Sequence, residues 1–304
     1  MNGPLLFLGM ATLDVVTVVP RLPGSDQVLE ARSLTLHGGG PAATAAVACA
    51  RLGGRARFAG SLATDPLSDS ILAGLATEGV DTALVQSSPD GTSPAATILV
   101  EEQSGRRAIL YSKGTAPEPV WGPALEQAVR GSRLLHLDGF HVHTAIRAAR
   151  CAREVGVPVS FDGGAGEPWP HQEDLLPLVD LMVVALDFAE RHTGVRDPFT
   201  AARALRDRFG AAEVVVTDGA RGAWFCAGDQ EGHVPALEVA VVDTTGAGDV
   251  FHGAYALARA EGAPVADAVR FAAAVAGLKC RAVGGRTGIP TRAEVDAVLA
   301  GAAP

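Results

Sequence analysis

The residues with the clearest chemical potential lie at 243–249, where the chain reads Asp-Thr-Thr-Gly-Ala-Gly-Asp. We expect a buried strand at 239–242, a glycine-rich turn, and a helix that begins near Asp249. Small residues allow backbone N–H groups to approach an anion closely, and a helix N-terminus favours negative charge. The segment therefore predicts a cradle for a phosphate group.

Asp249 has two interpretations at this position. An aspartate in the first turn of a helix is common because it stabilises the helix dipole. Beside a transferred phosphoryl group, however, a carboxylate would repel the phosphate unless it accepts the proton of an attacking hydroxyl. From these local features alone, dipole stabilisation and general-base catalysis are equally good interpretations of Asp249.

The elements that must position this segment alternate between strand and helix from about residue 132 onward. Apolar runs predict strands at 134–137, 157–161, 181–184 and 214–217, and helical periodicity predicts helices at 143–154, 200–209, 250–260, 264–281 and 292–300. This alternation predicts a mainly parallel sheet with helices on both faces. Such sheets bind ligands beyond the carboxyl ends of their strands.

The N-terminal part of the chain has a different pattern. Short apolar runs predict strands at 5–8 and 15–19, and Pro41 suits the first position of a helix that extends to about Leu52. Further on, β-rich pieces at 96–100 and 107–111 are joined by polar turn residues, which is a hairpin pattern.

The composition limits the class of protein. The chain has 304 residues, 48% of them hydrophobic, which is enough for one large α/β domain. Its net charge of −9 argues against binding to nucleic acid. The four cysteines are widely spaced, so we expect reduced, buried thiols. No run approaches the roughly 18 apolar residues of a membrane span, which favours a soluble cytoplasmic protein.

Two motifs give the chain a family resemblance. Residues 243–254, Asp-Thr-Thr-Gly-Ala-Gly-Asp-Val-Phe-His-Gly-Ala, resemble the C-terminal signature of the ribokinase-like (PfkB) carbohydrate kinases, and residues 38–53 resemble their N-terminal signature. Two signatures in the right order, far apart in the chain, are much more specific than one glycine-rich turn. The resemblance implies one ribokinase-like domain over residues 1–304, a three-layer α/β sandwich with a mainly parallel sheet. It also implies a small β-sheet lid formed by roughly 15–35 and 90–112.

The resemblance further implies ATP-dependent phosphorylation of a sugar hydroxyl, and it assigns roles to particular residues. Asp249 would be the general base, and the backbone of Gly246, Ala247 and Gly248 would form the anion hole. The other implied residues are Asp14, Gly39, Gly40, Thr44 and Asp138 for the sugar; Thr217, Gly219, Gly222 and Lys279 for the nucleotide; and Asp243 with Thr245 for a potassium-like ion. Solvated or turn-forming carboxylates remain alternatives at Asp14 and Asp138, and simple turn glycines remain an alternative at 217–222.

The resemblance also places other parts of the chain. The end of the helix at 272–280 and the loop at 284–288 would complete the adenine side. Mg²⁺ would accompany ATP, but Ala185 and Phe188 stand where the family has Asn and Glu, so Asp187 or Glu190 would have to replace them. Lids of this kind often pair between subunits, which predicts a homodimer.

Three other functions stay open. The motifs also look like those of the sulfofructose kinases, a subgroup of the family, yet the expected sulfonate-facing positions hold the apolar Phe140 and Leu110. A relative that acts on a ketose or a related sugar without a sulfonate is therefore favoured. A nucleoside kinase would want an aromatic cleft, which this aromatic-poor chain does not suggest. A catalytically silent sugar- or nucleotide-binding protein would explain the lost Asn and Glu, but not the retained Asp249.

Overall fold

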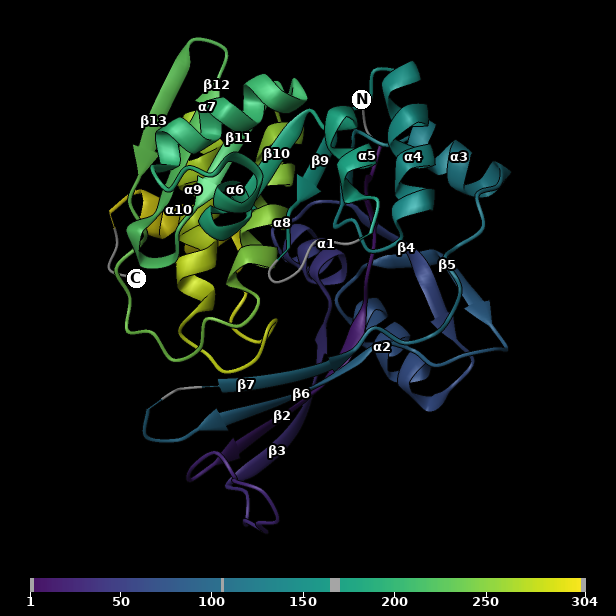
Figure 1. Ribbon diagram of the computed structural model, residues 1–304, viewed down its shortest axis with the longest axis vertical. Helices are drawn as coiled ribbons and strands as arrows, with labels where there is room; N and C mark the ends of the chain where they lie inside the picture. Colours follow the sequence, from purple (N-terminus) through teal and green to yellow (C-terminus); the bar gives the residue numbers. More distant parts are fainter. Residues whose placement is uncertain (1–2, 105–106, 165–169, 302–304) are drawn as a thin grey trace.

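The computed structural model describes residues 3–104, 107–164 and 170–301, and the described residues form two sheets of different size (Figure 1). The strands of the large sheet are β1 (Leu5–Leu8), β4 (Ala56–Ala63), β5 (Asp81–Ser88), β8 (Leu134–Leu137), β9 (Val159–Asp162), β10 (Leu181–Ala185), β11 (Glu213–Thr217), β12 (Ala223–Ala227) and β13 (Gln230–Val234). Their order is β13-β12-β11-β10-β9-β8-β1-β4-β5. Neighbouring strands from β5 to β11 are parallel, whereas β12 and β13 pair antiparallel. The mainly parallel sheet is confirmed.

Helices cover both faces of this sheet, as expected for a parallel sheet whose strands are buried on both sides. One hydrophobic core lies under α1 (Pro41–Arg51), α2 (Pro66–Thr77), α8 (Ala247–Ala260), α9 (Val265–Lys279) and α10 (Arg292–Leu299). The other lies under α3 (Pro123–Arg130), α4 (Val142–Glu154), α5 (Gln172–Leu175), α6 (Leu186–Thr193) and α7 (Pro198–Phe209). The three layers predicted from the resemblance are therefore confirmed.

Helices α1 and α8 approach each other closely because their facing residues are small. A Cβ atom at Gly253 would lie only 2.1 Å from the carbonyl oxygen of Ala45, so a glycine is needed at this crossing. The two signature helices therefore lie side by side. Their N-termini, at Pro41 and Ala247, carry the two motifs that sequence analysis singled out.

The second sheet is the lid, in the order β3-β2-β6-β7. Its strands are β2 (Thr12–Val19), β3 (Ser33–Gly39), β6 (Ala95–Glu101) and β7 (Arg107–Ser112), which extend away from the main body (Figure 1). The small sheet expected at roughly 15–35 and 90–112 is thus present, although residues 105 and 106 of that range lie outside the described residues. Strand β2 begins at Thr12, so Asp14 belongs to the lid strand itself.

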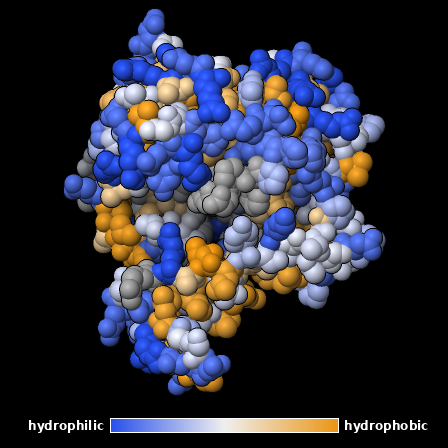
Figure 2. Space-filling model, viewed as in Figure 1, coloured by the Kyte–Doolittle hydropathy of each residue, from blue (hydrophilic) through white to orange (hydrophobic). Residues whose placement is uncertain are grey.

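Strand register separates the two faces of the lid, because directly paired residues point to the same side. Asp14 pairs with His37 and Ala96, which places these residues on one face, called here the inner face. On the other face, Leu36 pairs with Val15, Val15 with Thr97, and Thr97 with Leu110. Leu34, Leu36 and Leu110 share this outer face and are 63%, 61% and 61% exposed. Figure 2 shows apolar side chains gathered over the lower part of the molecule, where Figure 1 places the lid.

One predicted strand is wrong. Residues 239–242 form no strand, and Val241 and Val242 are 61% and 55% exposed. The backbone N–H groups of Val242 and Asp243 donate to the carbonyl oxygen of Cys280 instead, at 2.8 and 3.1 Å. The end of α9, rather than a neighbouring strand, therefore holds this segment. The valines of this segment predicted a strand because an apolar loop beside a cavity can have the same composition as a buried strand.

Two further expectations can be compared with the structure. All four cysteines are free and buried, as the sequence predicted. Within the described ranges, the structure has no helix that is long and apolar enough to cross a membrane.

Candidate active site

The candidate site lies where the root of the lid meets the N-termini of α1 and α8. Strand β3 ends at Gly39 and α1 begins two residues later, so the sugar-side positions predicted at Gly39, Gly40 and Thr44 fall on one short stretch. Gly40 adopts φ of +88°, and a Cβ atom there would lie 2.5 Å from the carbonyl oxygen of Met10. A side chain at Gly40 is therefore excluded by both conformation and space.

Asp14 is buried beside these glycines. Its Oδ1 accepts a hydrogen bond from Thr12 Oγ1 at 2.7 Å, and a Cβ atom at Gly39 would lie 2.2 Å from its Oδ2. Burial raises the pKa of Asp14, while the bond from Thr12 and the charge of Arg286 oppose the rise. Oδ2 of Asp14 faces the backbone of Gly39, which has no side chain to cover it. The Asp14 carboxylate is therefore well suited to accept hydrogen bonds from substrate hydroxyls.

Asp138 has a different environment. Its Oδ2 accepts the backbone N–H groups of Met10 and Ala42, at 2.8 and 3.2 Å, and its Oδ1 accepts that of Phe140 at 3.0 Å. Burial raises the pKa of Asp138 to about 6, although these bonds oppose the rise. The side chain thus ties the end of β1 to the start of α1, and the turn-forming alternative accounts for these three bonds.

Asp249 lies in the first turn of α8 and keeps part of its surface open to solvent. Burial raises the pKa of Asp249 to about 7, and the carboxylate of Asp162 adds to this rise. His252 opposes it, whereas Asp138 and Asp14 reinforce it. A carboxyl group whose proton affinity is tuned close to neutrality is suited to general-base work at physiological pH.

The turn before α8 has the geometry of an anion cradle. Gly246 is the N-cap residue with φ of +72°, and a Cβ atom there would lie 2.9 Å from the carbonyl oxygen of Gly285. The N–H of Ala247 donates back to the carbonyl oxygen of Thr244 at 3.2 Å. Gly246 and Gly248 are therefore better placed than Ala247 to donate to a bound anion.

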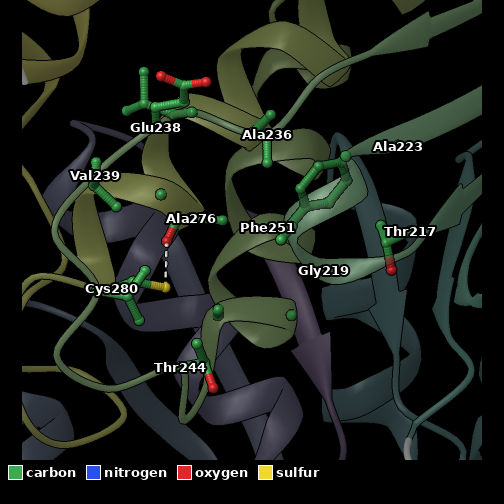
Figure 3. Close-up of a pocket in the computed structure, with 18 residues that line it drawn as sticks. Thr217, Gly219, Ala223, Ala236, Glu238, Val239, Thr244, Phe251, Ala276 and Cys280 are labelled. Carbon is green, nitrogen blue, oxygen red and sulfur yellow. Dashed lines mark hydrogen bonds between the residues drawn. The ribbon is translucent and has the colours of Figure 1, made fainter.

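A cavity of about 530 Å³ opens directly beside this turn (Figure 3). Its walls are mostly apolar and come from the β11–β12 turn, the 236–244 loop, the start of α8 and the end of α9: Thr217, Gly219, Ala220, Gly222, Ala223, Ala236, Leu237, Glu238, Val239, Val241, Thr244, Ala247, Gly248, Phe251, Ala273, Ala276, Gly277 and Cys280. Such a lining suits the flat, largely apolar faces of a nucleobase.

Three of the predicted nucleotide residues, Thr217, Gly219 and Gly222, line this cavity. Gly222 adopts φ of +93°, and a Cβ atom there would lie 2.1 Å from the carbonyl oxygen of Val234, so the turn requires glycine. The fourth, Lys279, is fully buried behind the wall. Its ammonium donates to the main-chain carbonyl oxygen of Asp243 at 2.9 Å.

Asp243 is held by several donors at once. Its Oδ1 accepts from the N–H and hydroxyl of Thr245 at 2.8 and 2.7 Å, and its Oδ2 accepts from Gly284 N–H at 2.8 Å. Arg107 of the lid lies 3.6 Å from Oδ1. Hydrogen bonds from Thr245 and Gly284 keep the pKa of Asp243 below its usual range, against the effect of burial. These donors and the Lys279 ammonium already bind oxygens of Asp243, so a monovalent cation at this loop stays a prediction that would depend on other carbonyl oxygens of the segment.

The loop at 284–288 contacts the stretch that carries Gly39 and Thr44, and none of its five residues is among those that line the cavity. The side chain of Arg286 is buried, donates through Nε to Thr44 Oγ1 at 3.2 Å, and donates through Nη2 to the carbonyl oxygen of Gly39 at 2.6 Å. Sequence reasoning missed Arg286. The only available signal was a lone arginine in a glycine-rich loop, and its long reach back to α1 is a tertiary feature.

Sequence reasoning also missed Asp162 and His252. Asp162 ends β9 at the carboxyl edge of the sheet, and His252 lies one turn after Asp249 on α8. The signal that could have found His252 is its three-residue spacing from Asp249, which places both on one face of a helix.

The positions of the missing Asn and Glu do not form a metal site. Phe188 is fully buried and its ring stacks on that of His192 at 4.1 Å, and Ala185 and Asp187 are exposed. Glu190 pairs with Arg196 at 3.1 Å. In the described part of the chain, no group of three His, Cys, Asp or Glu side chains could hold a metal ion.

Comparisons with known proteins agree on one family. The model of the pfkB family carbohydrate kinases matches residues 4–292. The ribokinase of Bacillus subtilis is 29% identical over 296 residues, covering 96% of this chain and 98% of the relative. The deoxyribokinase of Salmonella typhi is 30% identical over 262 residues, covering 82% and 83%.

The similarity extends to three dimensions. The structure of Arabidopsis thaliana ribokinase complexed with ribose and ATP superposes with a TM-score of 0.87 at 28% identity, covering 98% of this chain and 99% of that one. The chain belongs to the pfkB family of carbohydrate kinases, phosphotransferases that use a hydroxyl group as acceptor.

Proposed function

We propose that this protein transfers the γ-phosphoryl group of ATP to a hydroxyl of a sugar, with Asp249 as the general base. One observation carries the proposal: the first turn of α8 contributes Gly248 to the wall of the 530 Å³ cavity and, one residue later, the carboxyl group of Asp249. A nucleotide in the cavity would direct its terminal phosphate toward this turn. An acceptor hydroxyl held from the lid side would then lie between Asp249 and that phosphate, as in-line transfer requires.

The N–H groups of Gly246 and Gly248, with that of Ala247 as a weaker third donor, would stabilise the charge that develops on the transferred group. They belong to the positive end of α8, where the helix dipole adds to the hydrogen bonds. Asp14, Gly39, Gly40 and Thr44 would hold the sugar, and Asp138 would keep the surrounding backbone in place.

ATP would occupy the cavity with its base against the apolar walls. Thr217, Gly219 and Gly222 are its predicted contacts, and the similar Arabidopsis structure is described as a complex with ATP. Mg²⁺, carried by the phosphates, would neutralise part of their charge. The side chains and backbone groups named above would carry out binding, orientation and proton transfer.

Lys279 would supply the positive charge that the family resemblance assigns to a potassium-like ion. Its ammonium is fully buried and 2.9 Å from the Asp243 carbonyl oxygen. A fixed ammonium at this position steadies the segment that leads into the anion hole without a bound metal ion.

The sugar is proposed to be a ketose or a related sugar that lacks a sulfonate. Leu110, at one predicted sulfonate-facing position, is apolar and lies on the outer face of the lid. Relatives named ribokinase and deoxyribokinase make pentoses the first candidates.

A homodimer would cover the exposed leucines of the outer lid face, Leu34, Leu36 and Leu110. Apolar side chains gathered on one face of a small sheet commonly mark an interface. Changing Leu36 to Asp should convert a dimer to a monomer in sedimentation experiments, and an unchanged mass would argue against this interface.

The decisive experiment is a coupled ATP-consumption screen over pentoses, ketoses, sulfofructose and nucleosides, repeated with Asp249→Asn. The variant should bind the sugar normally by calorimetry but lose about 10³-fold or more in kcat, because the amide of Asn cannot accept the proton of the attacking hydroxyl as a general base does. Turnover that survives in the variant would exclude Asp249 as the base. Turnover of nucleosides alone would exclude the sugar kinase.

A further inference from the structure

A buried histidine–aspartate pair lies beside Asp249. The Nε2 atom of His252 is 3.2 Å from Oδ1 of Asp162, and only 7% of either side chain is exposed. Asp162 ends β9, and His252 follows Asp249 by three residues on α8, so both face the same edge of the sheet as the proposed base.

Packing alone does not account for this pair. The His252 ring lies 5.6 Å from the ring of His136, whose Nδ1 is 3.2 Å from Ser160 Oγ. Nδ1 of His252 and Nε2 of His136 are buried and have no hydrogen-bond partner among the described residues. Buried polar atoms without partners destabilise a fold, so apolar side chains would stabilise this position better.

The charged groups that face Asp249 come from every surrounding element. Asp162 of β9, Asp138 after β8 and Asp14 of β2 make it harder to ionise, and His252 of its own helix makes it easier. Lys279 of α9 and Arg286 of the following loop contribute positive charge. Asp162 and His252 differ from the other charged groups in two respects. They contact each other, and Asp162 favours the protonated form of Asp249 whereas His252 favours the ionised form.

We propose that Asp162 and His252 are positioning residues that together set the charge state of the catalytic base. Asp162 favours retention of the proton on Asp249, and His252 favours its release. The proposal rests on the proposed role of Asp249. Burial acts to raise the pKa of Asp162, but the adjacent His252, with Gly164 N–H and His136, outweighs it and keeps this pKa low. Asp162 therefore stays ionised while Asp249 gives up and regains its proton.

Two conservative changes separate the two effects. Asp162→Asn should move the acidic limb of the kcat/KM profile for the sugar to lower pH by about one unit, and His252→Gln should move it to higher pH by a similar amount. The double variant should return toward the original midpoint. A purely structural role would lower activity at every pH without opposite shifts, and two shifts in the same direction would overturn the proposal.

A matched control is available in His192, another buried histidine near a carboxylate, with its Nε2 3.3 Å from Glu173 Oε1. His192→Gln should leave the midpoint unchanged, because His192 packs on Phe188 rather than beside Asp249.

A second measurement does not depend on turnover. ¹³C NMR can follow the carboxyl carbon of Asp249, assigned by its loss in Asp249→Asn. Its titration midpoint should fall in Asp162→Asn and rise in His252→Gln, and an unchanged midpoint in both would overturn the inference. If these shifts occur while Asp249→Asn remains active, the base assignment fails and the electrostatic coupling stands.

Discussion

The ammonium nitrogen of Lys279 donates a hydrogen bond to the main-chain carbonyl oxygen of Asp243, 2.9 Å away, from a fully buried position at the end of α9. This bond joins α9 to the segment that leads into the proposed anion hole. The nearby charges of Asp243 and Asp249 favour the charged form of Lys279, although burial dominates and lowers its pKa.

The first prediction concerns this ammonium. Lys279→Met should lower kcat by about 10-fold or more, because the turn that presents Gly246 and Gly248 loses its anchor. The wild-type enzyme should keep most of its activity when potassium is replaced by a large organic cation. Lys113→Met, at the other lysine of the chain, is the exposed control and should have little effect. Strong activation of the wild type by potassium would contradict this role of Lys279.

The second prediction concerns the brace formed by Arg286. A Cβ atom at Gly38 would lie 2.1 Å from Arg286 Nη1, so Gly38→Ala should displace the guanidinium from Thr44 and Gly39. The KM for the sugar should rise several-fold while the KM for ATP stays the same. Gly74→Ala on α2, where an added Cβ has nothing within 4 Å, is the matched control. Equal changes in both KM values would show a general disturbance of the fold.

The third prediction is the pH dependence that follows from Asp249. Because its pKa is about 7 and the base must be ionised, kcat/KM should rise with pH through about 7 and then level off. The folded state also binds this proton more tightly than the unfolded chain does. Stability from this group is therefore lost as pH rises from about 4 to 7.

Asp249→Asn removes this pH-dependent loss of stability, because the amide of Asn does not titrate. Thermal unfolding of wild type and variant between pH 4 and 8 should show the variant gaining relative stability as pH increases. A constant difference in Tm across this range would mean that the pKa of Asp249 is not raised.

The fourth prediction tests the nucleotide cavity. Ala276→Leu adds apolar volume to its wall and should raise the KM for ATP about 10-fold while sugar binding is retained, because overpacking of a site of this kind costs about 1–3 kcal/mol. Ala297→Leu, on the exposed side of α10, makes the same change away from the cavity and should be neutral. A larger effect on the sugar than on ATP would place the nucleotide elsewhere.

The sequence by itself determined the fold class and the type of chemistry. Alternating apolar segments specify a mainly parallel sheet, and two glycine-rich helix starts specify backbone that can approach an anion, because both depend on local residue types. The same local reasoning misplaced residues 239–242. A run of valines has the same composition in a buried strand as in an apolar loop beside a cavity, and only the hydrogen bonds to Cys280 distinguish them.

Tertiary structure decided how the charges around the site are arranged. Arg286 reaches Thr44 and Gly39 from the far end of the chain, and Asp162 meets His252 across the gap between β9 and α8. No local pattern encodes these contacts, because each depends on the relative positions of elements far apart in sequence. The proton affinity of Asp249 is such a property: the sequence supplied the carboxylate, and burial among distant charges set its pKa near 7.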